Sequence, residues 1–228
     1  MTVAPAAALA ALREAGDAAR AADMARYHKT AREVLGVSNP QIDAFVRAWR
    51  AEDDAVAARC ALAAGLWDSG VFEARIAAAK LLTQARIAED APVWTLLAAW
   101  VPDFDGWAIA DHACGAAARR LSADPARLDA VEAWTQASSL WTRRAALVAT
   151  LPWAKQRHPS PEDLARRDRI LGWAAAYAPD REWFIQKAIG WWLRTLSKHD
   201  PDRVRAFLDA HGATLKPFAA REAVKHLR

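Results

Sequence analysis

Residues 72–82 read FEARIAAAKLL, an aromatic residue followed by ten residues that favour a helix. Residues 141–151 (WTRRAALVATL) and 184–194 (FIQKAIGWWLR) align with this stretch, and residues 107–117 (WAIADHACGAA) fit less closely. The leading aromatic residues at 72, 107, 141 and 184 stand roughly 35 to 43 residues apart. That spacing suits two helices and two turns, so it predicts pairs of helices stacked along the chain.

The rest of the chain agrees with an all-helical fold. Hydrophobic residues make up 54% of the 228 residues, glycine is scarce, and no run alternates apolar and polar residues as a strand would. We therefore predict an all-α, HEAT-like helical-repeat solenoid with a concave basic face. It would form a single domain over 1–228, with residues 1–20 as a peripheral N-terminal helix. No stretch of about 18 uncharged apolar residues occurs, so we expect no membrane-spanning helix.

Four dipeptides predict where helices begin: Asn39-Pro40, Asp124-Pro125, Ser160-Pro161 and Asp200-Pro201. In each of them a residue that caps helices precedes a proline, which the first helical position tolerates because it needs no N–H. Asp163 follows Ser160 by three residues and adds a pattern that resembles a capping box.

The charge is distributed unevenly along the chain. Residues 1–139 carry 14 Lys/Arg and 18 Asp/Glu, a net charge of −4, whereas residues 140–228 carry 17 and 9, a net charge of +8. A basic C-terminal half suits a polyanion such as nucleic acid. A solvated surface that happens to be rich in arginine explains the same numbers equally well.

Trp107 and Asp111 are four residues apart in a stretch that otherwise predicts a buried helix, so they should share one helix face. A carboxylate among apolar neighbours is costly to bury unless it has a partner or a function. An aromatic face beside an anion suits a cation, particularly a delocalised one. A structural ion pair or a helix cap is the alternative explanation for Asp111.

Corresponding positions of a repeat point in similar directions. In the aligned stretches the fourth and fifth positions carry Arg75, Asp111, Arg144 and Lys187, and Trp191 occupies the eighth position of its stretch. We therefore predict that these side chains share one surface, where the cationic ones would bind a phosphate backbone. Most tryptophans on such helices belong to the core, which is the alternative for Trp107 and Trp191.

The chain resembles the AlkD-like DNA alkylation repair glycosylases over about residues 24–228. The resemblance is carried by residues 72–78, 107–111, 141–146, 184–191 and 221–226. It implies that Asp111 is the active-site aspartate, that Trp107 and Trp191 are its aromatic walls, and that Arg144 contacts a phosphate. The N-terminal tyrosine of the family falls on Tyr27, but the following His28 departs from the usual methionine.

The resemblance implies a monofunctional glycosylase that hydrolyses the N-glycosidic bond of cationic N3- or N7-alkylated purines in double-stranded DNA. No cofactor and no metal would be needed, and the protein would act as a monomer. Cys60 and Cys114 have no metal-ligand spacing and read as reduced core thiols, so we expect a cytoplasmic protein. The alternatives are a helical-repeat module that binds DNA without catalysis and a scaffold for protein interactions.

Overall fold

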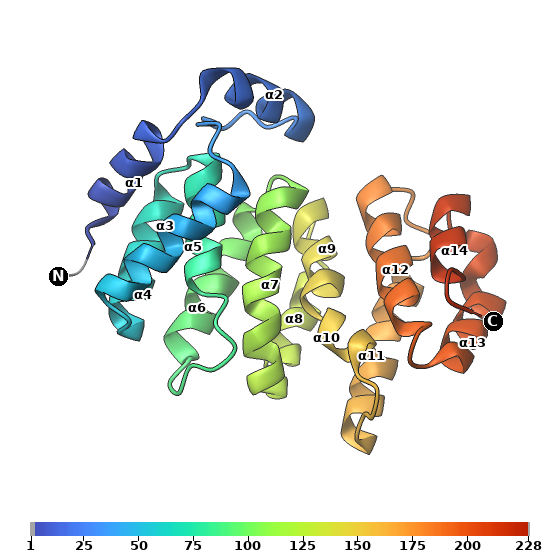
Figure 1. Cartoon of the computed structure of the whole chain (residues 1–228). Helices are drawn as coiled ribbons and strands as arrows, with labels where there is room; N and C mark the ends of the chain where they lie inside the picture. Colours follow the sequence, from blue (N-terminus) through green and yellow to red (C-terminus); the bar gives the residue numbers. More distant parts are fainter. Residues whose placement is uncertain (1–2, 228) are drawn as a thin grey trace. The chain divides into compact units, whose positions relative to one another are not determined.

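The computed structural model describes residues 3–227, which are helical and contain no strand. The helices form two compact units, an N-terminal unit over 1–123 and a C-terminal unit over 124–228. The all-helical fold with helical repeats is confirmed (Figure 1). The predicted single domain and the concave basic face stay predictions.

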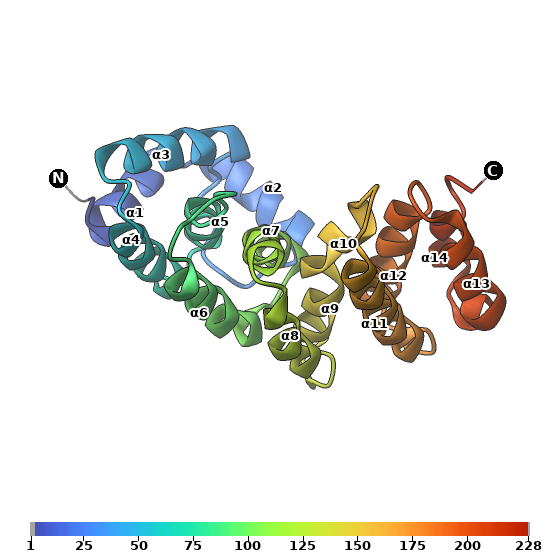
Figure 2. The same ribbon diagram turned by 90° about the horizontal axis from the view of Figure 1, so that it is seen from below.

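The N-terminal unit is built around α5, which lies between α3, α4 and α7 (Figures 1 and 2). Nearly every side chain of α5 is buried, which explains why its sequence shows no polar face. The elements of this unit are α1 (Pro5–Glu14), α2 (Ala18–His28), α3 (Asn39–Glu52), α4 (Val56–Asp68), α5 (Phe72–Leu81), α6 (Ala91–Trp100), the 3₁₀ turn η1 (Val101–Asp103) and α7 (Trp107–Ala123).

The C-terminal unit is built around α12, which packs against α9, α10, α11, α13 and α14 (Figure 1). The elements of this unit are η2 (Pro125–Arg127), α8 (Leu128–Trp134), α9 (Leu140–Ala149), α10 (Leu151–Lys155), α11 (Pro161–Tyr177), α12 (Trp183–Leu196), α13 (Pro201–His211), η3 (Gly212–Thr214) and α14 (Pro217–Ala223).

The aromatic residues of the repeat mark helix starts, as the sequence predicted. Phe72 and Trp107 are the first residues of α5 and α7, whereas Trp141 and Phe184 are the second residues of α9 and α12. A large ring in the first turn of each helix packs against neighbouring elements and so helps to define where the helix begins. The four aligned aromatic residues therefore all lie in the first turn of a helix, in registers that differ by one residue.

The capping signals are confirmed at three of the four positions. Ser160 and Asp200 are the N-caps of α11 and α13, and Asp124 caps the 3₁₀ turn η2 that leads into α8; each side chain accepts a backbone N–H of the following turn. The fourth helix, α3, begins one residue earlier than predicted because Ser38 is its N-cap and forms a capping box with Gln41. The helix predicted over 1–20 is also divided: α1 ends at Glu14, and Asp17 caps a new helix.

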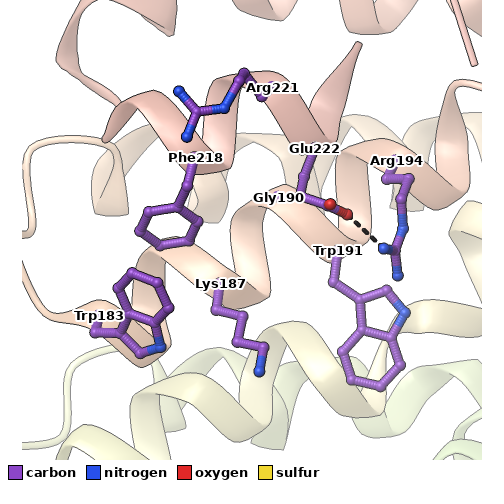
Figure 3. A pocket seen from close by; sticks show the side chains of 8 residues that line it. All are labelled: Trp183, Lys187, Gly190, Trp191, Arg194, Phe218, Arg221 and Glu222. Carbon is purple, nitrogen blue, oxygen red and sulfur yellow. Dashed lines mark hydrogen bonds and ion pairs between the residues drawn. The ribbon is translucent and has the colours of Figure 1, made fainter. Parts of the chain in front are cut away.

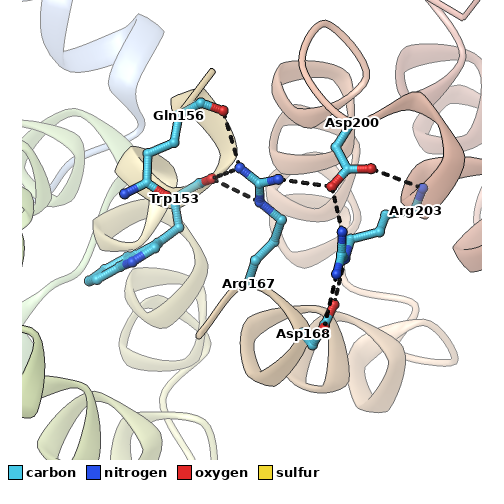
Figure 4. A network of polar contacts seen from close by, with 6 residues as sticks. All are labelled: Trp153, Gln156, Arg167, Asp168, Asp200 and Arg203. Carbon is cyan, nitrogen blue, oxygen red and sulfur yellow. Dashed lines mark hydrogen bonds and ion pairs between the residues drawn. The ribbon is translucent and has the colours of Figure 1, made fainter. Parts of the chain in front are cut away.

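A buried polar network connects three segments of the C-terminal unit (Figure 4). Arg167 of α11 is 1% exposed, and its guanidinium donates to the carbonyl of Trp153 in α10, to the carbonyl of Gln156 directly after α10, and to the carboxylate of Asp200 at 2.8 Å. Arg203 donates to the same carboxylate at 2.8 Å. One buried cation therefore holds the end of α10 and the start of α13 to α11.

Among the described residues, no helix has the length and the apolar character that crossing a membrane requires.

Candidate nucleic-acid interface

Trp107 begins α7, and Asp111 follows it by one turn. Both side chains are half-buried, whereas the residues between them on the helix are fully buried. The two residues therefore lie on one face of α7, as their spacing predicts, and the structure adds that this face is partly exposed.

Aromatic rings surround Trp107 in the N-terminal unit. The Tyr27 ring meets it edge-on at 6.0 Å between centroids, and the His28 ring lies at 5.0 Å. His28 also contacts Phe72 at 4.8 Å. Tyr27 is 71% exposed, whereas burial lowers the pKa of His28, so this imidazole is neutral at pH 7. The last turn of α2 thus forms an aromatic edge beside Trp107.

Asp111 lies on the wall of a cavity of about 370 Å³ between α3, α5 and α7. The cavity is lined by Asp43, Val46, Arg47, Arg50, Lys80, Thr83, Asp111, His112 and Gly115. Three of these are permanent cations, and the Lys80 ammonium donates to Asp43 at 2.6 Å. Asp111 therefore lines a cavity that brings three cations together with two carboxylates, its own and that of Asp43.

His112 is held neutral in the same cavity. Burial, and to a smaller extent the Lys80 ammonium, lower the pKa of His112 against the opposing effect of the Asp111 and Asp43 carboxylates. Arg47 and Arg50 were not among the predicted site residues, although their spacing of three residues places them on one face of a helix. Nothing in the sequence indicates that this face of α3 lies beside α7.

A buried carboxylate anchors the segment between α2 and α3. Glu73 is fully buried and accepts backbone N–H groups of Leu35, Gly36 and Val37 at 2.9, 2.7 and 3.2 Å. Gly36 has a φ of +80°, and a Cβ there would lie 2.1 Å from the carbonyl oxygen of Asp17. These contacts restrain the segment that joins α2 to α3, and with it the position of α2 beside α5.

Glu73→Gln is expected to lower the free energy of unfolding by about 1–3 kcal/mol. The amide keeps one carbonyl oxygen but presents an N–H group to a backbone donor, so a buried N–H loses its acceptor. Urea unfolding followed by circular dichroism measures the change. Glu33→Gln is the matched control, since Glu33 is an exposed carboxylate paired with Arg13 and should contribute less than about 1 kcal/mol. Equal losses in both variants would contradict the anchoring role.

The structure places Arg75 away from the predicted surface. It is 8% exposed, its Nε donates to the carbonyl of Trp67 at 3.1 Å, and its guanidinium lies 4.3 Å from the Trp67 ring centroid. A further hydrogen bond reaches the carbonyl of Asp103 at 3.4 Å. The expectation that Arg75 contacts phosphate is corrected: α4 and η1 enclose this arginine, which joins them to α5.

Arg144 of the C-terminal unit is also buried, with 2% of its surface exposed, where the sequence predicted a surface position. Its guanidinium lies 5.8 Å from the Trp141 centroid and 6.0 Å from the Phe184 centroid. The adjacent Arg143 turns to the other side of α9 and pairs with Asp180 at 3.2 Å. Adjacent residues of a helix are about 100° apart, which explains why the two arginines contact different neighbours.

Lys187 and Trp191 line a cavity of about 540 Å³ between α12 and α14 (Figure 3). The cavity is lined by Trp183, Lys187, Gly190, Trp191, Arg194, Phe218, Arg221 and Glu222. Lys187 is exposed and Trp191 half-buried, so both are at the surface as predicted. Sequence analysis missed Trp183 and Phe218, which the alignment of repeats does not distinguish from core residues.

The predicted site residues thus belong to two groups. Trp107 and Asp111 lie on α7 of the N-terminal unit, with Tyr27 against Trp107. Lys187 and Trp191 lie in one cavity of the C-terminal unit. Among residues 3–227, no group of three or more His, Cys, Asp or Glu side chains is arranged to hold a metal ion.

Solved structures with the same fold include a "Predicted DNA alkylation repair enzyme" from Enterococcus faecalis, with a TM-score of 0.76 and 24% identity over 93% of this chain and 96% of that one. AlkD2 from Streptococcus mutans has a TM-score of 0.61 and 19% identity over 82% and 89%. The smu.31 protein of Streptococcus mutans UA159 has a TM-score of 0.61 and 19% identity over 83% and 92%. At these identities the likeness shows the fold alone.

No curated protein matches the sequence of this chain. A family model described as DNA alkylation repair enzyme matches residues 8–227, nearly the whole chain. This chain therefore belongs to the family of DNA alkylation repair enzymes.

Proposed function

We propose that the protein is a monofunctional DNA glycosylase that releases cationic N3- and N7-alkylated purines from double-stranded DNA. The observation that carries the proposal is the position of Asp111, a partly exposed carboxylate one helical turn from Trp107, on the wall of a cavity lined by cationic side chains. Family membership supplies DNA as the substrate class.

The proposed reaction is a hydrolysis. Alkylation of a ring nitrogen makes the purine a cationic leaving group, and the electron pair of the N-glycosidic bond departs with the base. Positive charge then develops on the deoxyribose as an oxocarbenium-like species. A water oxygen forms the new bond to the sugar carbon and releases a proton to the solvent, which leaves a neutral free base and an abasic site. The Asp111 carboxylate would stabilise the developing cation and orient the water.

The aromatic side chains would hold the lesion. A tryptophan face attracts a delocalised cation by about 0.5–2 kcal/mol, which favours the alkylated base over its neutral counterpart. Trp107 in the N-terminal unit and Trp191 in the C-terminal unit are both partly exposed, as this role requires. Because water is the nucleophile of the proposed hydrolysis, no lysine nucleophile is needed. We therefore expect no covalent intermediate between the protein and the DNA.

The phosphate contacts belong to side chains that solvent can reach. Lys187 and Tyr27 are exposed, and the N-terminal cavity adds Arg47 and Lys80. Arg144, which the resemblance assigns to a phosphate, is 2% exposed, so contact with a phosphate would require its side chain to move. Each phosphate that is neutralised releases counterions, so affinity for duplex DNA should fall steeply as salt is raised.

The test is release of free base from a methylated DNA duplex incubated with purified protein. Chromatography should identify 3-methyladenine or 7-methylguanine, and the strand should break only after alkali treatment, as an abasic product requires. Binding of duplex without base release would point instead to a non-catalytic DNA-binding module. Weak binding at every salt concentration would favour a protein scaffold.

A further inference from the structure

The cavity between α12 and α14 contains an exposed tryptophan that the proposed reaction does not use. Trp183, the first residue of α12, is 50% exposed. Its ring lies against Phe218 of α14, with 4.0 Å between centroids and an interplanar angle of 34°. An indole is a large apolar surface to leave in water, so a surface tryptophan at a cavity is typical of a binding site.

The two helices hold these rings in a fixed position. At Gly190, a Cβ would lie 3.2 Å from the Cα and the carbonyl oxygen of Ala219, so α12 and α14 approach closely at this point. This close contact between the helices gives the rings of Trp183 and Phe218 a rigid base. Rings that are already held in place lose little conformational freedom when a ligand binds, so less affinity is lost to ordering them.

The charge around the platform is positive. Arg194 and Glu222 form an ion pair at one end of the cavity, and this pair neutralises the carboxylate (Figure 3). Lys187 and Arg221 are exposed, and among residues 3–227 neither forms an ion pair with a carboxylate. Two cations are therefore available beside two aromatic rings.

The cavity side of α12 alternates these two kinds of side chain. Its residues 183, 187, 191 and 194 are Trp, Lys, Trp and Arg, at spacings that place them on one helix face. Figure 3 shows Lys187 between the indoles of Trp183 and Trp191. Aromatic rings that alternate with cations are typical of surfaces that bind single-stranded nucleic acid, where bases stack on the rings and phosphates meet the cations.

We propose that this cavity binds an unstacked nucleotide of single-stranded DNA, with its base on the Trp183–Phe218 platform and its phosphates on Lys187 and Arg221. The proposal rests on the proposed function in taking DNA as the ligand, and it shares Lys187 with the phosphate contacts proposed there. Trp183, Phe218 and Arg221 have no role in that reaction. In an intact duplex both faces of every base are already stacked, so the exposed indole needs a base from a strand end, a gap or a flap. A cavity of about 540 Å³ is within the range of small-molecule sites and admits a nucleotide.

The test measures binding of an undamaged oligothymidylate 12-mer to the whole chain at low salt, by fluorescence anisotropy. Trp183→Ala and Phe218→Ala are each expected to weaken binding by about tenfold or more, as loss of a stacked base does. Trp183→Phe should restore most of the affinity because a phenyl ring still stacks. Arg221→Gln should reduce the salt dependence of log K by about 0.7, the value for one phosphate contact on a single strand.

Trp134→Ala is the matched control, since Trp134 is a half-buried tryptophan of the same unit that does not line the cavity. Circular dichroism of each variant checks that it is folded. Equal affinities of folded Trp183→Ala and Trp134→Ala for the 12-mer would overturn the proposal. This test is independent of base release. If the protein released no methylated base, the proposed glycosylase activity would be wrong. The proposed subsite would still be supported if Trp183→Ala weakened the binding of the single strand.

Discussion

Asp111→Asn is expected to lower the rate of methylated-purine release by about 10²- to 10³-fold while leaving the affinity for duplex DNA largely unchanged. The amide has nearly the same size and keeps a carbonyl oxygen, so the packing around α7 should persist. It lacks the negative charge that would stabilise the developing sugar cation. The loss should therefore appear in the chemical step and leave the binding step intact.

Single-turnover base release, with protein in excess over a methylated duplex, isolates that step. Asp43→Asn is the control because it removes the same charge from the opposite wall of the same cavity. Asp43 is bonded to Lys80, so its effect on release should be much smaller. Comparable rates in the Asp111→Asn variant and the unmodified protein would exclude Asp111 as the catalytic carboxylate.

Arg167→Met is expected to lower the free energy of unfolding by about 3–5 kcal/mol, the usual cost of breaking a buried ion pair from one side. The substitution removes the cation bonded to Asp200 and leaves the carbonyls of Trp153 and Gln156 without this donor. Such a loss is a large fraction of the stability of a typical domain. Denaturant unfolding followed by circular dichroism measures it.

The neighbouring Arg166 provides the matched control. Arg166 pairs with Asp163 on the same helix at 2.8 Å, and about a third of its side chain is exposed. Arg166→Met should therefore cost less than about 1 kcal/mol. If both methionine variants lost the same stability, burial of the Arg167 network would not be the source of the effect.

Acid should weaken the same network. Burial raises the pKa of Asp200, but hydrogen bonds from Arg203 and Arg167 outweigh it and hold the pKa below its usual range. A carboxylate whose pKa is lowered by folding stabilises the folded state. This stabilisation is fully present above the pKa of the carboxylate in the unfolded chain, about 3.9, and it is lost as the pH falls through the pKa in the folded protein. The difference in stability between the protein and Arg167→Met should therefore shrink below about pH 4. A constant difference down to pH 2 would contradict this linkage.

Sequence analysis predicted the helices well because the signals that define them are local. Asp124, Ser160 and Asp200 cap helices through contacts within three residues, and the aromatic repeat places one bulky ring in the first turn of each of four helices. At α3 the N-cap is Ser38 and not the predicted Asn39, so the helix begins one residue before its predicted start.

Some features of the candidate site were predicted from the sequence and others were not. The difference depends on how far apart in the chain the contacting residues lie. Trp107 and Asp111 are related by one helical turn, so their shared face follows from spacing alone. Arg75 occupies a corresponding position of its repeat but is enclosed by Trp67 and η1, which come from other segments. The stacking of Trp183 on Phe218 joins side chains of α12 and α14, and neither residue belongs to the four stretches that the repeat aligns.

The sequence by itself determined the helices, their repeat and the pairing of an aromatic ring with a carboxylate on α7, because each depends on neighbours within a turn or two of the chain. Only the tertiary structure decided which cations are buried. The free energy of an arginine side chain depends on whether carbonyls and carboxylates of distant segments surround it. Those partners made Arg167 a structural centre and Arg75 a core residue, and left Lys187 and Arg221 exposed to a ligand.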